Sequence, residues 1–144
     1  FEVVLQHLFG DSGFGTQINA TFVSGGDVEI DRYDTSRQFI LPGLGDSSNF
    51  SLFYEDTKIT ARIALNTRGE TIAGFGNYDQ PLYVEERNQW DLSMAYNINE
   101  DAVVFFEVQN LNDEPTRLYA RYEEMLFLSQ DHGPIHRLGF RYKF

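Results

Sequence analysis

The sequence lacks cysteine altogether, which excludes disulfide frameworks, thiolate zinc sites and cysteine nucleophiles. It also lacks any run of about 18 apolar residues, the length that a transmembrane helix requires. Basic residues are scarce, with 11 Lys and Arg against 22 Asp and Glu and a net charge of −11. A nucleic-acid partner is therefore disfavoured, because phosphate binding needs a basic surface. Neither a nucleophile elbow nor another catalytic motif occurs, so we do not expect an enzyme.

Aromatic residues are plentiful, at 15% of the chain, and most of them belong to stretches in which apolar and polar residues alternate. A period of two predicts strands that are apolar on one face. The expected strands cover residues 1–9, 14–23, 49–55, 59–68, 89–98, 102–110 and 136–144. The sequence therefore predicts an all-β fold, an antiparallel up-and-down meander of about seven strands.

The connections between these strands alternate in length. Those at 10–13, 56–58 and 99–101 are tight turns, whereas those at 24–48, 69–88 and 111–135 are long and rich in Gly and Pro. In an antiparallel meander, alternate connections lie at the same end of the sheet. All tight turns are thus expected at one end and all long loops at the other, as in transmembrane barrels.

The charges of the expected strands fall on the stripe opposite the apolar one, as a strand between lipid and a polar lumen requires. The stretch 102–110 is less regular, since it is apolar on both faces except for Glu107, Gln109 and Asn110. The charges of Arg62, Arg68, Asp91, Arg141 and Lys143 fall on one stripe. The expected membrane-facing residues on the other stripe are Trp90, Leu92, Met94, Leu138, Phe140 and Tyr142. A soluble acidic β-barrel or sandwich that binds a small ligand is the alternative, and in it these apolar residues would face a protein interior.

Several stretches resemble TonB-dependent outer-membrane receptors. The segment VFFEVQNLNDEPTRLY (104–119) followed by HRLGFRYKF (136–144) is similar to the end of those receptors. NFSLFYE (49–55), ARIALN (61–66) and QWDLSMAY (89–96) resemble other barrel strands of the same family. The order and spacing of these stretches carry the resemblance across nearly the whole chain.

The resemblance implies that residues 1–144 form the C-terminal part of a 22-stranded barrel in the bacterial outer membrane. The plug domain, the TonB contact and the earlier strands would precede Phe1, so we expect a fragment or a processed product. Seven strands do not close such a barrel. In an isolated fragment the unpaired edge strands, at residues 1–9 and 136–144, are expected to pair with a second copy. The family imports ferric siderophores, haem, cobalamin or oligosaccharides, energised through the TonB complex. Phe140, Tyr142 and the final Phe144 resemble the signal that the barrel assembly machinery reads.

Substrate contacts are expected from aromatic and arginine side chains in the long loops, because these residues stack on sugars and chelated ligands. The candidates are Tyr33, Arg37, Tyr78, Tyr83, Arg87, Arg117, Tyr119 and Arg121. The alternative is that the loop aromatics bury one another. No cofactor or metal is expected, although the acidic stretch 27–34 leaves a Ca²⁺ site open. Residues 117–128 are compatible with either a short helix or extended strands.

Overall fold

The computed structural model describes residues 1–24, 30–34 and 36–144, and two antiparallel sheets account for its regular structure. The larger sheet has seven strands in the order β1-β2-β3-β4-β7-β8-β11. Their bounds are Glu2–Leu8 (β1), Phe14–Thr21 (β2), Ser47–Glu55 (β3), Ile59–Arg68 (β4), Arg87–Asn97 (β7), Ala102–Gln109 (β8) and Ile135–Tyr142 (β11). These strands confirm the seven that the alternation predicts, and every pairing between them is antiparallel.

The smaller sheet has four strands in the order β10-β9-β6-β5 and is built from two hairpins within the long loops. Its strands are Thr71–Phe75 (β5), Pro81–Val84 (β6), Thr116–Ala120 (β9) and Leu126–Gln130 (β10), with a single 3-10 turn at Asn77–Asp79 (η1). The described residues thus form eleven strands: the seven expected ones are present, and the four of the smaller sheet were not expected. Residues 117–128 form no helix: they comprise most of β9, the turn at 121–125 and the start of β10, and β9 pairs with both β6 and β10. No helix in the described part of the chain is long and apolar enough to cross a membrane.

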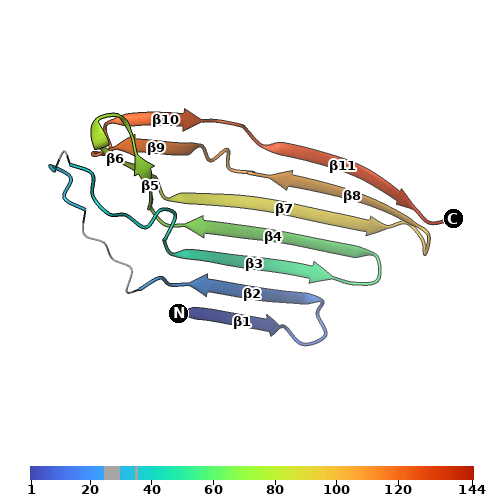
Figure 1. Ribbon diagram of the computed structural model, residues 1–144. Coiled ribbons are helices and arrows are strands. Elements are labelled where there is room, and N and C mark those ends of the chain that lie inside the picture. The colour runs from blue at the N-terminus through green and yellow to red at the C-terminus, as the bar shows by residue number, and fades with distance from the viewer. Residues whose placement is uncertain (25–29, 35) are drawn as a thin grey trace.

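The seven-stranded sheet is open and slab-like, with β1 at one edge and β11 at the other (Figure 1). All of its tight turns, at 9–13, 56–58 and 98–101, lie at one end. The described parts of the first long connection and the connections 69–86 and 110–134 lie at the opposite end, where the last two carry the four-stranded sheet. The predicted asymmetry of the connections is therefore present.

The four-stranded sheet holds four of the seven buried apolar residues of the described chain, and the other three, Ala64, Ala102 and Val108, belong to the large sheet. The four are Leu82, Tyr83, Tyr119 and Ala120. The accessible surface is 9975 Å², whereas a compact monomer of this mass exposes about 7,600 Å². The excess arises because both faces of the large sheet are left uncovered.

Candidate functional site

The large sheet has one face that carries no charged residue on any strand. Directly opposed residues of antiparallel strands point to the same face, so the register defines this face row by row. One row runs Ala61–Met94–Phe106–Leu138, and the next runs Leu52–Ile63–Leu92–Val108. Trp90, Leu92, Met94, Leu138, Phe140 and Tyr142 all lie on it. We call this surface the apolar face.

The apolar face is exposed where a soluble sheet would be covered. Leu138 is 78% exposed and Phe140 is 62% exposed. Aromatic rings gather towards its tight-turn end, where Phe14 lies 4.8 Å from Tyr54, and Tyr142 contacts Phe144 at 5.3 Å between centroids. The Tyr54 hydroxyl donates to Asp56 in the turn at 2.7 Å, so its polar end points away from the apolar band. An amphipathic ring of this kind suits a boundary between oil and water.

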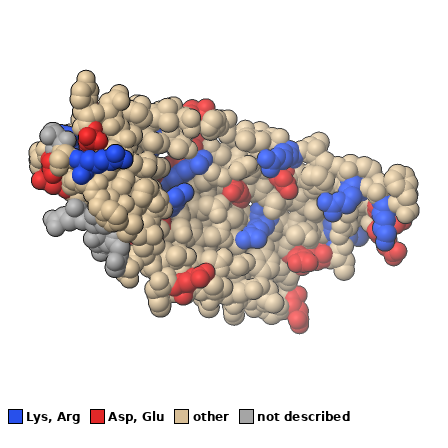
Figure 2. All heavy atoms as spheres, in the orientation of Figure 1, with Lys and Arg blue, Asp and Glu red and all other residues tan. Residues whose placement is uncertain are grey.

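All charged residues of the seven strands occupy the opposite, polar face: Glu2, Glu55, Arg62, Arg68, Arg87, Asp91, Glu107, Arg137 and Arg141. Charges of both signs are distributed along the strands in the view of Figure 2. Asp91 is the centre of a hydrogen-bond network on this face. Its carboxylate accepts from Asn66 Nδ2 at 2.8 Å, Gln89 Nε2 at 2.7 Å and the Asn110 backbone N–H at 2.9 Å. Asn49 extends the network by donating to Asn66 at 2.6 Å.

Two glycines on the polar face are each covered by an aromatic ring from the neighbouring strand. Gly15 pairs with Phe53 and Gly139 pairs with Phe105. A Cβ at either glycine would clash with the ring that lies over it. Such cross-strand glycine–aromatic pairs help to hold the register of a curved sheet. They account for the aromatic rings of Phe53 and Phe105 on the face that carries the charges.

The four-stranded sheet contains a polar cluster at its centre. The rings of Tyr83 and Tyr119 stack at 5.2 Å between centroids across the β6–β9 pair. The Tyr119 hydroxyl donates to the Glu70 carboxylate. The Arg32 guanidinium lies 5.0 Å from the Tyr83 ring centroid and donates to the Arg121 carbonyl at 3.3 Å. Segment 30–34 is thereby joined to both hairpins of the loop sheet.

The ionisation of this cluster follows from its contacts. Burial, followed by the hydrogen bond to Glu70, raises the pKa of Tyr119 well above its ordinary value. Partial burial lowers the pKa of Arg32, but nearby Tyr83, Tyr119 and Glu70 outweigh it and raise the net value. Arg32 therefore remains charged and Tyr119 remains neutral at physiological pH.

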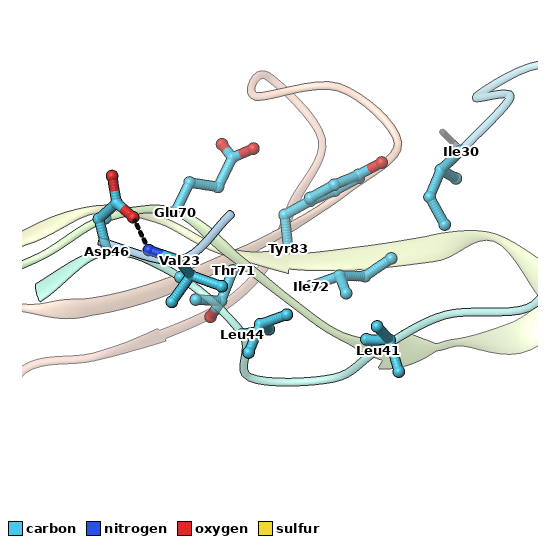
Figure 3. A pocket seen from close by; sticks show the side chains of 11 residues that line it. Val23, Ile30, Leu41, Leu44, Asp46, Glu70, Thr71, Ile72 and Tyr83 are labelled. Carbon is cyan, nitrogen blue, oxygen red and sulfur yellow. Dashed lines mark hydrogen bonds between the residues drawn. The ribbon is translucent and has the colours of Figure 1, made fainter. Parts of the chain in front are cut away.

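A cavity of about 520 Å³ lies beside this cluster, where the first long loop runs along β5 (Figure 3). Ile30, Leu41, Leu44 and Ile72 supply its apolar lining, and Asp46, Glu70 and Tyr83 also border it. Asp46 accepts from the Val23 backbone N–H at 2.8 Å, and the Gly43 N–H donates to the Ile72 carbonyl at 2.9 Å. Both carboxylates at the border already have donors, since Tyr119 donates to Glu70. The cavity is large enough for a small group with both apolar and polar surface.

The structure separates the expected substrate-contact residues into three sets. Tyr83 and Tyr119 are 8% and 2% exposed and form the centre of the loop sheet, with Arg121 directly after β9. Tyr33, Tyr78 and Arg37 are exposed. Arg87 and Arg117 are half-buried and bind neighbouring loop groups. Arg117 forms an ion pair with Glu85 at 3.3 Å, and Arg87 donates to the Glu114 carbonyl at 3.4 Å.

Sequence reasoning missed Arg32 and Glu70, which complete the tyrosine cluster. The two residues belong to different loops and follow no local motif. The sequence marks these two residues only weakly: Arg32 is a cation within an acidic stretch, and Glu70 directly precedes the β-branched residues Thr71 and Ile72. Of the acidic stretch itself, Asp27 and Glu29 lie outside the described residues. Asp31 and Asp34 accept hydrogen bonds from Tyr33 and Ser36 within tight local turns.

Within the described ranges, no group of three or more His, Asp or Glu side chains is arranged to hold a metal ion. Comparisons of the chain with protein families, with curated proteins and with solved structures gave no match.

Proposed function

We propose that this chain is a segment of the wall and external loops of an outer-membrane transport barrel of the TonB-dependent receptor type. The observation that carries the proposal is the exclusion of every strand charge from the apolar face. A charged side chain at mid-depth in a bilayer costs about 2–4 kcal/mol, whereas in water it costs little on an exposed strand. A sheet face in water has no reason for so complete an exclusion.

The length of the strands supports the same proposal. The central strands β3, β4 and β7 have 9, 10 and 11 residues. A tilted strand crosses the hydrocarbon core with about 9–11 residues. The separation of tight turns from long loops also fits a barrel with short periplasmic turns and large external loops.

The direction of the edge strands adds a topological requirement. The sheet contains an odd number of antiparallel strands, so β1 and β11 run in the same direction (Figure 1). If they closed on each other, they would form a parallel pair within an antiparallel barrel. Closure in the antiparallel pattern requires an odd number of additional strands, and about fifteen complete a barrel of 22. Two copies of the chain with the same orientation in one membrane cannot meet this requirement, because β11 of one copy would pair in parallel with β1 of the other.

In this proposal the polar face lines the lumen and the loop sheet stands at the outer surface. The transported molecule is a bulky nutrient, and the energy comes from TonB through a plug domain outside these residues. The soluble binding module receives less support, because nothing in the described part of the chain covers Leu138 or Phe140.

Membrane fractionation of cells that express the full-length protein tests the proposal. We expect the protein in the outer-membrane fraction, resistant to alkaline carbonate extraction and released by detergent. A folded barrel should also migrate differently on a gel before and after boiling. Recovery of folded protein in the soluble fraction without detergent would contradict the proposal.

A further inference from the structure

The tips of the two loop hairpins meet and enclose a groove at the end of the loop sheet away from the wall. The β5–β6 tip contains η1, and the β9–β10 tip begins at Arg121. The Arg121 backbone N–H donates to the Pro81 carbonyl at 3.0 Å and so holds the tips together. The groove has a volume of about 640 Å³, and its lining comes entirely from these tips: Tyr78, Asp79, Gln80, Arg121, Tyr122 and Met125.

Three of the six lining residues have a left-handed backbone conformation. The φ angles are 60° for Tyr78, 50° for Asp79 and 60° for Arg121. Glycine adopts this conformation without strain, whereas a residue with a side chain does not. Strained positions of this kind cluster at binding and catalytic sites, where the side chain is needed. Of the five non-glycine residues with a positive φ in the described chain, three line this groove, and the other two are Asn110 and Asp113.

The side chains of the groove combine aromatic surface with balanced polar groups. Tyr78 is 94% exposed, which is unusual for a large ring held in a constrained turn. Tyr122 provides a second ring, which meets the Tyr33 ring edge to face at 6.3 Å between centroids. Nε of Arg121 is buried and has no hydrogen-bond partner within the described structure. Asp79 balances the charge of Arg121, so the groove has no net charge.

We propose that this groove is a binding subsite for neutral oligosaccharides. The C–H faces of a sugar ring stack on exposed tyrosine rings, while its hydroxyls accept from an arginine and donate to a carboxylate. An anionic ligand, such as a negatively charged ferric siderophore or a phosphorylated molecule, would require an excess of cations that this groove lacks. The inference depends on the proposed transport function for its biological role, but the binding itself is testable independently.

The experiment measures binding of maltohexaose, cellohexaose and xylohexaose to the full-length protein in detergent, by titration calorimetry. The decisive variant is Tyr78→Gly, because glycine relieves the backbone strain at φ 60° and removes only the ring. We expect at least one of these sugars to bind, and we expect Tyr78→Gly to weaken binding by roughly tenfold or more without loss of thermal stability. Tyr78→Phe should retain most of the affinity.

The matched control is Phe39→Ala, which removes an aromatic ring that is 71% exposed in the first long loop and does not line the groove. It should leave the affinity unchanged. Absence of binding by all three sugars at millimolar concentration, or equal affinity in Tyr78→Gly and the wild type, would overturn the subsite. If the protein fractionates with the outer membrane but binds none of the sugars, the subsite fails and the proposed function stands. If the protein binds one of the sugars but is soluble without detergent, the subsite stands and the proposed function fails.

Discussion

Replacing Leu138 by Arg should have opposite consequences in lipid and in water. Leu138 lies on the apolar face and is 78% exposed. Three residues separate it from the start of β11 and four from its end, which places it roughly 10 Å and 14 Å from the two ends. It is therefore close to mid-depth in the proposed bilayer, where an arginine costs about 2–4 kcal/mol. On a water-exposed strand the same change would stay within about 0.5 kcal/mol.

The assay is a denaturant titration of the full-length protein refolded into lipid vesicles, followed by the gel shift between folded and unfolded forms. A cost of that size lowers the folding equilibrium constant by about thirty- to eight-hundred-fold. Arg137→Gln is the neighbouring control on the polar face, where it removes an exposed ion pair of 3.7 Å to Glu107. Such a pair contributes at most about 1 kcal/mol.

A second control tests depth on the same face. Tyr142→Arg places the charge at the last residue of β11, where the cost in a bilayer falls to about 0–1 kcal/mol. The predicted order of destabilisation is therefore Leu138→Arg first, with Tyr142→Arg and Arg137→Gln well below it. If Leu138→Arg costs no more than Arg137→Gln, the apolar face does not contact lipid and the reasoning is refuted.

Three further predictions concern the polar face and the loop sheet. Gly139→Ala should destabilise the protein by about 1–3 kcal/mol in the same titration, because the new Cβ clashes with the Phe105 ring. Adding Phe105→Leu should recover part of this loss, because it removes the ring that clashes. If the costs of the two substitutions simply add, the contact between Gly139 and Phe105 does not contribute to stability. Asp91→Ala should lower the free energy of unfolding by about 2–3 kcal/mol, because it removes an acceptor of three hydrogen bonds. A change near zero would show that Asp91 does not hold this network together. Because folding raises the pKa of Tyr119, the folded loop sheet keeps a proton that the unfolded chain loses, so its stability is full below about pH 10 and falls as pH rises beyond it. Hydrogen exchange of β9 against pH measures this fall, Tyr119→Phe should flatten it, and an unchanged slope in that variant would contradict the assignment to Tyr119.

The seven wall strands were predictable because each carries its own signal. In β7, for example, the alternation from Trp90 to Tyr96 continues unbroken through the strand, and the tight turn 98–101 marks its end. The sidedness follows from the same alternation, since the register introduces no shift across the large sheet. Local pattern was sufficient there because tertiary pairing agrees with it.

The loop sheet was not predictable from local pattern. β5 and β6 have 5 and 4 residues, include Gly74 and Pro81, and do not alternate. β9 becomes a strand by pairing with β6, although residues 117–128 contain good helix formers. The tyrosine cluster and the groove join residues from separate loops, and only the assembled hairpins bring them together. Tyr78 was expected as a substrate contact from its residue type alone, without its strained turn.

The sidedness of the wall is tested most directly by the fluorescence of Trp90, the only tryptophan of this sequence, which lies on the apolar face of β7. The measurement compares quenching by brominated lipid with quenching by aqueous iodide in vesicles that contain the full-length protein. Subtracting the Trp90→Phe variant isolates the signal of this residue. If the apolar face contacts lipid, the lipid should quench Trp90 strongly and iodide should quench it little. Quenching by iodide without quenching by the lipid would contradict this contact.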